Sequence, residues 1–146
     1  MPKSNFYEAG ILNLLLNGTA IPGIAAIDST VNTLYVALHT SSPGGTGDQT
    51  ANEISYTGYQ RVAVTRSSTS PSWVISGGAP ASASPVANIT FGMMTGGTGG
   101  TVTYFSIGAS ASGTGAIYYY GAVEPTINVV NGLAPQLSTA TTITEL

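Results

Sequence analysis

The sequence contains no cysteine, and charged side chains are nearly as scarce. Without cysteine there are no disulfide bonds, no thiolate nucleophiles and few options for a tight zinc site, so packing and assembly contacts must supply the stability. Three residues are basic and six are acidic, which is 6% of 146, whereas 42% are hydrophobic and 19 are glycine. Soluble domains usually carry about a quarter charged residues, because mixed charge prevents self-association. We therefore expect much of the surface to be covered in a large assembly; a monomer solubilised by serine and threonine is the alternative.

The few basic residues also argue against two kinds of partner. Lys3, Arg61 and Arg66 cannot form the positive stripe that neutralises phosphates, so we expect no direct binding of nucleic acid. The apolar run at 9–16 is shorter than the roughly 20 residues that cross a bilayer, so we expect no membrane partner. Glu8 and two asparagines interrupt the apolar region, which makes it a poor match to a secretion signal.

The N-terminal apolar run predicts a short helix over residues 5–17. Asn5 can cap its start, Glu8 follows three residues later in the capping-box position, and Gly18 offers the left-handed residue that ends many helices. Leucines and isoleucine occupy most of its circumference, so this helix needs cover on nearly every side. Three of its residues are candidate interface residues: Leu12, Leu15 and Leu16.

From residue 23 onward the hydrophobic pattern has the period of two that is typical of β-strands. In the first strand, the alternating residues from Leu34 to Leu38 share a face that we expect to be buried, which leaves Tyr35 and His39 on an open face. The candidate strands are 33–39, 59–66, 72–76, 86–91, 101–107, 116–123, 126–130 and 139–146. Seven or eight strands predict an all-β, jelly-roll-like sandwich or barrel.

The length of the chain favours a single domain over residues 1–146, because about 150 residues bury enough surface for one core. We expect the helix at 5–17 and the β-sandwich at 33–146. The segment 67–85, in which Trp73 stands alone among small residues, is expected to form a projecting loop or arm, or an ordinary crossover loop.

Residue types that support catalysis are few. His39 is the only histidine; it precedes hydroxyl residues at 40–42, which it could activate with Asp48 or Glu53 orienting its ring. No nucleophile-elbow motif surrounds it, so we favour a histidine hydrogen-bonded to backbone at the rim of the sheet. The six acidic residues are scattered and predict no catalytic carboxylate pair. We therefore expect neither an enzyme nor a cofactor.

Phosphate and metal sites find equally little support. The glycine-rich stretch 96–100 lacks the lysine of a phosphate-binding loop and leads into a strand, whereas an anion site requires a helix N-terminus. Calcium held by Asp48, Glu53 and carbonyls of the 41–53 loop is an alternative, although calcium prefers six to eight oxygen ligands. We expect no metal site.

Two groups of tyrosines stand out in the predicted strands. Tyr118 and Tyr120 point to the same side of one strand, and a Tyr-Thr-Gly-Tyr turn at 56–59 brings two further rings face to face. Glu53 and Arg61 flank this turn, where they could close a hairpin or meet across a subunit boundary. Such tyrosines pack sheets, anchor protein interfaces or bind sugars. The candidate interface residues of this region are Tyr56, Tyr59, Arg61, Tyr118 and Tyr120.

Two longer stretches carry a more specific pattern. The first comprises Leu-Tyr-Val-Ala-Leu-His-Thr at 34–40, Ser-Pro-Gly at 42–44, Gly-Asp-Gln at 47–49, Asn-Glu at 52–53 and Tyr-Thr-Gly-Tyr-Gln-Arg-Val-Ala-Val at 56–64. The second comprises Thr-Tyr-Phe-Ser-Ile-Gly at 103–108, Tyr-Gly at 120–121, Asn-Gly-Leu-Ala-Pro at 131–135 and Thr-Ile-Thr-Glu at 142–145. Together they resemble a group of small tailed-bacteriophage virion proteins, which includes capsid cement or decoration proteins and tail-fibre proteins.

This resemblance implies an all-β, jelly-roll-like fold and a structural role, with no catalytic residues. Combined with the scarcity of charge, it leads us to expect a cement protein on the outer surface of the capsid. Such a protein would act as a homodimer or homotrimer that bridges neighbouring subunits of the major capsid protein and stabilises the expanded shell. The alternative is a tail-fibre or receptor-binding protein that contacts glycans of the host surface.

Overall fold

The computed structural model describes residues 3–28, 30–46 and 48–145. These residues form two compact units: unit 1 comprises the described parts of Met1–Thr33, Val64–Asn88 and Ser138–Leu146, and unit 2 those of Leu34–Ala63 and Ile89–Leu137. A single domain over 1–146 stays a prediction. The ends of that range, the last residue of the expected strand 139–146 and Gly47 of the 41–53 loop lie outside the described residues.

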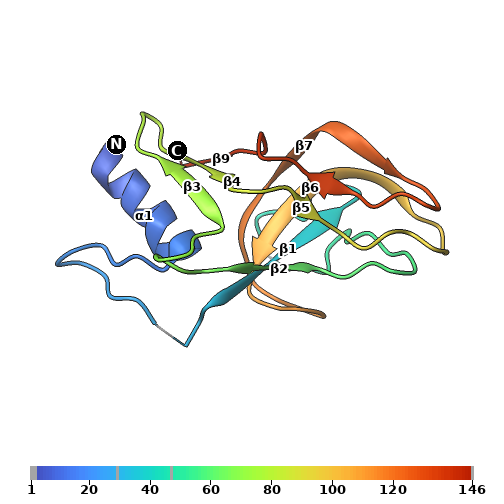
Figure 1. Ribbon diagram of the computed structural model, residues 1–146, viewed down its shortest axis with the longest axis horizontal. Coiled ribbons are helices and arrows are strands. Elements are labelled where there is room, and N and C mark those ends of the chain that lie inside the picture. Colours follow the sequence, from blue (N-terminus) through green and yellow to red (C-terminus); the bar gives the residue numbers. More distant parts are fainter. Residues whose placement is uncertain (1–2, 29, 47, 146) are drawn as a thin grey trace. The chain divides into compact units, whose positions relative to one another are not determined.

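The described residues form one helix and nine strands, arranged in several antiparallel sheets (Figure 1). The elements are α1 (Asn5–Asn17), β1 (Thr33–His39), β2 (Val62–Thr65), β3 (Trp73–Ser76), β4 (Ser82–Pro85), β5 (Ile89–Thr90), β6 (Gly100–Gly108), β7 (Ile117–Val129), β8 (Gln136–Leu137) and β9 (Ile143–Thr144). The sheet orders are β2-β1-β6-β7, β3-β4-β9 and β5-β8. No sheet of this described part closes into a barrel, so the fold is all-β and sandwich-like, and the barrel alternative is wrong.

Helix α1 has the bounds that the sequence predicts, but a different residue caps it. Ser4, not Asn5, is the N-cap: its hydroxyl accepts a hydrogen bond from the amide of Tyr7 at 3.3 Å. Gly18 ends the helix with φ of 60°, in the left-handed region that glycine adopts without strain. Across the described residues, no helix is long and apolar enough to cross a membrane.

Within unit 1, α1 packs against the hairpin of β3 and β4 (Figure 1). Leu12 and Leu16 are fully buried, and Trp73 at the start of β3 is 1% exposed. The carboxylate of Glu8 accepts a hydrogen bond from the amide of Ala81 at 3.0 Å, so it binds the hairpin and does not complete a capping box. Leu12 and Leu16 are therefore core residues of unit 1, whereas Leu15 is half-buried; a role for the three leucines at an interface stays a prediction.

The segment 67–85 is not the projecting arm that we expect from its small residues. It contains β3 and β4, which pair in antiparallel register with Trp73 opposite Pro85. The hairpin is held in unit 1 because the indole of Trp73 is buried and because the side-chain amide of Asn17 donates to the Trp73 carbonyl at 3.2 Å. The isolated tryptophan thus marks a core and not an exposed loop.

Arg66 binds the carbonyl groups at the end of α1. Its Nε donates to the carbonyl oxygen of Leu15 at 2.8 Å, its Nη2 to that of Leu14 at 2.7 Å, and its Nη1 to those of Val31 at 2.8 Å and Asp28 at 3.3 Å. The last carbonyls of a helix have no partners within the helix and carry partial negative charge. One guanidinium therefore satisfies the helix end and attaches it to the segment 28–31.

In unit 2, β1 and β6 pair in antiparallel register, with Val36 opposite Ile107, and both of these side chains are fully buried. Leu34 and Leu38 are buried as predicted. The expectation of an open opposite face is wrong for His39, which is also fully buried. The segment 49–53 covers this face, because the carbonyl oxygen of Ala51 contacts the His39 ring.

The longest strand, β7, joins two strands that the sequence pattern separates at residues 124–125. Pro125 is accepted there because β7 lies at the edge of its sheet, where a missing amide hydrogen breaks no ladder bond. The register with β6 also shifts between Val102 and Tyr104, opposite this part of β7. By contrast, β4 and β8 were not expected, and β5 and β9 are much shorter than the expected 86–91 and 139–146.

Replacing Arg66 should test its role at the helix end. We expect Arg66→Ala to lower the free energy of unfolding by about 2–3 kcal/mol, because hydrogen bonds to a charged group contribute roughly 1.5–3 kcal/mol. Arg66→Lys is the control: it keeps the charge but lacks the planar fork, so it should recover less than half of the loss. Urea unfolding followed by circular dichroism measures both values. Equal midpoints for Arg66→Ala and the parent protein would contradict the assignment.

Candidate functional site

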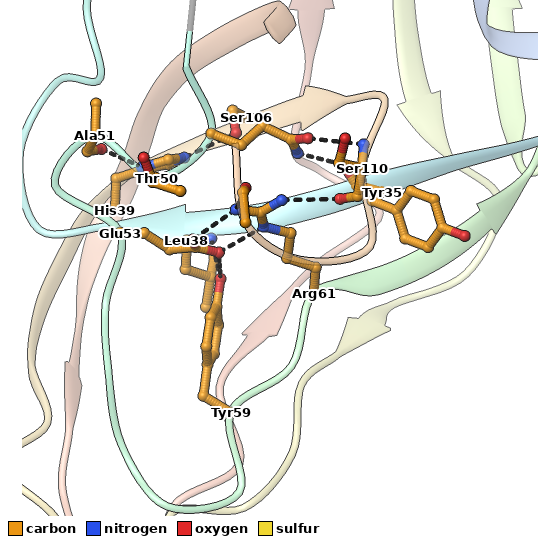
Figure 2. Close-up of polar contacts among 12 residues, drawn as sticks. Tyr35, Leu38, His39, Thr50, Ala51, Glu53, Tyr59, Arg61, Ser106 and Ser110 are labelled. Carbon is orange, nitrogen blue, oxygen red and sulfur yellow. Dashed lines mark hydrogen bonds and ion pairs between the residues drawn. The ribbon is translucent and has the colours of Figure 1, made fainter. Parts of the chain in front are cut away.

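Polar side chains of unit 2 gather around Arg61 (Figure 2). We call Glu53, Tyr59 and Arg61 the Arg61 cluster. Nε and Nη2 of Arg61 donate to Oε1 and Oε2 of Glu53, both at 2.7 Å. The Arg61 side chain is only 2% exposed and that of Glu53 16%. This pair therefore joins the two ends of the 53–61 segment within the chain, and it is buried; the segment is a loop and not the expected hairpin.

The rest of the Arg61 guanidinium binds the loop that follows β6. Nη1 donates to the carbonyl oxygen of Ser110 at 2.9 Å, and Nη2 to that of Gly113 at 2.8 Å. The bonds to Glu53 raise the pKa of Arg61, so the guanidinium stays charged. The loop at 109–116, which connects β6 to β7, is thus held by hydrogen bonds to the charged side chain of Arg61.

Tyr59 completes the cluster from the other side of the carboxylate. Its hydroxyl points at Glu53 in Figure 2 and donates to Oε1 at 2.8 Å, while it accepts a hydrogen bond from the amide of Leu38 at 3.1 Å. Burial raises the pKa of Tyr59 far above its ordinary value, so the hydroxyl remains a donor at any physiological pH. Tyr59 therefore joins the carboxylate to the backbone of β1.

Gln49 is a second fastening of the same loop. Its amide nitrogen donates to the carbonyl oxygen of Tyr35 at 3.2 Å, and its amide oxygen accepts from the amide of Ser110 at 3.0 Å. The residue is fully buried, and a Cβ on Gly108 or Gly115 would overlap its side chain. No local sequence pattern indicates this role, because only the tertiary fold brings the Gln49 side chain between two glycines remote in sequence.

His39 forms a buried hydrogen-bonded pair with Ser106 on β6. Nδ1 lies 2.8 Å from the carbonyl oxygen of Ala51, and Nε2 lies 2.7 Å from the hydroxyl oxygen of Ser106. A carbonyl can only accept, so Nδ1 carries the hydrogen and Nε2 accepts from the hydroxyl. Both side chains are 0% exposed, and desolvation lowers the pKa of His39. The two hydrogen bonds of the His39 ring therefore link β1 to β6 and to residue 51, and solvent does not reach them.

The partners that the sequence suggested for His39 and for calcium are engaged elsewhere. Asp48 Oδ1 accepts from the amide and the hydroxyl of Thr50, each at 2.9 Å, and these bonds lower the pKa of Asp48. Glu53 belongs to the Arg61 cluster. Among residues 3–28, 30–46 and 48–145, no group of three or more histidines, aspartates and glutamates could hold a metal ion.

The remaining candidate interface residues divide by exposure. Tyr56 is 7% exposed, and its hydroxyl donates to the Gly92 carbonyl at 2.8 Å. Its ring lies 5.3 Å from that of Tyr59, as the turn predicts, but the two rings are tilted by 59° and do not lie face to face. Tyr56 and Arg61 both make their hydrogen bonds to other residues of unit 2. Tyr118 and Tyr120 are each 43% exposed on β7, so these two tyrosines stay candidate contact residues.

An open depression of about 520 Å³ lies beside the Arg61 cluster. Tyr35 and Gln60 contribute to its wall, the loop 111–113 forms another part, and the three residues of the cluster line the remainder. Its volume falls within the range of roughly 300–1,000 Å³ that small-molecule sites occupy. The ring of Tyr35 points away from the other labelled side chains in Figure 2.

The described residues thus form an antiparallel β-protein with few charges, internally bonded polar groups and exposed apolar side chains. The family model of the podophage GP4 fiber I protein gp80 matches residues 2–144. Because this match covers nearly the whole chain, the protein belongs to that family of bacteriophage virion proteins. No curated protein matches the chain. The resemblance to small tailed-phage virion proteins is confirmed, and the family name specifies a fibre.

Removing the carboxylate of the Arg61 cluster should destabilise the protein strongly. We expect Glu53→Ala to lower the free energy of unfolding by about 3–5 kcal/mol, because it leaves a buried guanidinium without its counter-charge. Glu124→Ala is the matched control, since it removes the same charge from an exposed position on β7. Chemical unfolding of both variants measures the difference. A loss no greater in Glu53→Ala than in Glu124→Ala would refute the role of the pair.

His39 should make stability depend on pH. Its folded pKa is lowered, so the unfolded chain takes up a proton near the ordinary pKa of 6.5 while the folded protein does not. The free energy of unfolding should therefore be constant above about 6.5 and fall as the pH decreases below it. His39→Gln should remove this slope between pH 7 and 5, where the exposed carboxylates remain ionised. Thermal unfolding at several pH values tests this, and identical slopes in both proteins would exclude His39 as the cause.

Proposed function

We propose that this protein is a structural subunit of a podophage tail fibre. The observation that carries the proposal is the extent of the family match, which includes residues of both units and all nine strands. A fibre subunit needs no reacting group; it has to hold its shape and bind neighbouring subunits. The internal hydrogen bonds of Arg61 and Arg66 help each unit to hold its shape.

Exposed apolar side chains support the second requirement. In unit 1, Phe6 is 65% exposed, Ile24 73% and Val74 54%; in unit 2, Met93 is 52% and Val130 51% exposed. Burying such a side chain at an interface contributes about 1.5–3 kcal/mol, and little charge opposes the approach of a second surface. We therefore include self-association as a homodimer or homotrimer in the proposal. A jelly-roll arrangement of the strands is a separate part of it.

The chain has no heptad pattern and no constant repeat of the kind that builds an elongated shaft. In our proposal it is a segment of the fibre, outside any shaft, that binds other virion proteins through its apolar surface residues. Attachment by packing and by hydrogen bonds of strand edges suits such a surface, because neither requires charged side chains.

A cement or decoration protein on the outer capsid surface is the second candidate. The specific observation that favours it is the same exposed apolar surface with few charges, which would lie equally well against the major capsid protein. The two candidates differ in symmetry, because a tail follows a low-order cyclic symmetry whereas a shell repeats its subunits many times.

The number of copies per virion distinguishes the two functions. Quantitative mass spectrometry of purified virions, calibrated on the major capsid protein, should give about a dozen to a few dozen copies of a fibre subunit, as cyclic tail symmetry allows. Cryo-electron microscopy of the same particles should place the density at the tail. Hundreds of copies on the capsid surface would reject the fibre and establish the cement function, and absence from the virion would reject both.

A further inference from the structure

We propose that a groove beside α1 receives the Phe6 ring of a second copy of this chain, so that two copies form a symmetric dimer. The groove lies within unit 1, between the side of α1 that carries residues 6, 9, 10 and 13 and the segment 19–22 that follows the helix. The inference rests on the proposed function, because it names the partner and the surface of the self-association included there.

The outward side of α1 carries no charged side chain. A helix on the surface of a globular protein normally presents charged and polar residues to water, opposite its buried stripe. In α1 the only charged residue is Glu8, which is 7% exposed and binds the amide of Ala81 in the hairpin. Leu12 and Leu16 complete the buried side. A second protein surface can therefore cover the outward side without removing the hydration of an ion.

The groove itself is apolar and has room for one aromatic ring. Ile21 is 4% exposed and packs so closely against α1 that a Cβ on Gly10 would lie 3.3 Å from its side chain. Both polar atoms of the Asn13 side chain are engaged within the helix, since Nδ2 donates to the Ala9 carbonyl oxygen at 3.1 Å and Oδ1 accepts from Asn17 at 3.3 Å. The volume of the groove is about 230 Å³. An apolar cavity of about 150 Å³ already accepts benzene.

Phe6 is the ring that matches this groove. It stands at the edge of the groove and is 65% exposed, so it does not fill the groove of its own chain. Ile24, in the turn that begins at Ile21, is 73% exposed, and Tyr7 on α1 is 40% exposed. An aromatic ring that is buried in a pocket and surrounded by further contacts is the usual centre of a protein interface. The same small region thus holds both a projecting ring and a groove that can receive one.

The positions of the ring and the groove suit a two-fold axis. Residues 6, 9, 10 and 13 are three and four apart, so they lie on one side of α1. When two such helices cross in opposite directions with the axis between residues 9 and 10, residue 6 of each copy lies beside residue 13 of the other. Asn13 and the segment 19–22 line the groove at that point, so each Phe6 enters the groove of its partner. A contact of this kind is self-complementary and closes after two copies.

A second copy fits the groove better than a small molecule or a membrane. The volume of the groove lies below the range of roughly 300–1,000 Å³ that small-molecule sites occupy. Anionic lipid headgroups bind to available basic side chains. Lys3 is paired with Glu145, and Arg66 is bound to carbonyl oxygens of α1, so neither is available to such headgroups. The net charge of −3 also opposes an anionic surface.

Sedimentation equilibrium of the purified chain tests the proposal. We expect the parent protein to show a monomer–dimer equilibrium. Phe6→Ala should weaken the dimer by about a hundredfold or more, because two buried rings are lost from each dimer and each loss costs roughly tenfold or more in affinity. Ala20→Leu tests the groove from its other wall: this exposed residue lines the groove, so a larger side chain takes the space of the ring and should also weaken the dimer.

Tyr118→Ala is the matched control, because it removes an exposed aromatic ring that does not line the groove and should leave the dimer unchanged. Urea unfolding midpoints close to that of the parent protein show that the variants keep the fold. A further measurement needs no variant. In an equal mixture of ¹³C-labelled and unlabelled chains, isotope-filtered NMR should detect contacts between the Phe6 ring of one copy and the Ala20 methyl group of the other.

Four results would overturn the proposal: a monomer at every concentration up to about 1 mM, a trimer, a dimer that Phe6→Ala does not weaken, or contacts between copies that exclude the groove. A monomer that co-sediments with neutral phosphatidylcholine vesicles would assign the groove to a lipid and would also overturn it. Because these experiments use the isolated chain, such results leave the number of copies per virion unaffected, and with it the test of the fibre assignment.

Discussion

The ion pair between Arg61 and Glu53 is the interaction on which the arrangement of unit 2 depends. A guanidinium that is 2% exposed is tolerated only because a carboxylate, two backbone carbonyls and good geometry replace the water it has lost. These bonds connect the 53–61 segment to the loop after β6. Tyr59 extends the connection to β1, and the open depression beside the cluster is lined by the same residues.

Unit 1 uses the same chemistry at another place. Arg66 binds carbonyl oxygens at the end of α1 and in the segment 28–31, and Lys3 pairs with Glu145 near the two ends of the chain. The three basic residues are therefore engaged in internal contacts within the described part of the chain. What is left on the surface is mainly hydroxyl, amide, glycine and apolar groups. Such a surface suits a virion protein, because neighbouring subunits replace water without having to remove the hydration of ionic groups.

The sequence pattern located the elements that its local signals determine. The helix at 5–17 and the strand at 33–39 have their predicted bounds, because leucine-rich helical spacing and β-branched alternation act over short distances. Strand β4 was missed because Ser-Ala-Ser-Pro has no β-propensity of its own and pairs with β3 and β9 through long-range contacts. The burial of Trp73 in segment 67–85 and of Leu12 and Leu16 in α1 was not foreseen for a related reason: exposure depends on which other segment covers a residue.

The sequence by itself determined the composition-driven properties: an all-β chain with one short helix, no cysteine chemistry, few charges and membership of a virion protein family. Only the tertiary structure decided what the individual polar residues do. His39, Gln49, Arg61 and Arg66 find their partners through contacts between segments remote in sequence, and the spacing of residues along a chain carries no information about such contacts. The physical reason is that a buried polar group must be satisfied by whichever group the fold brings within hydrogen-bond distance.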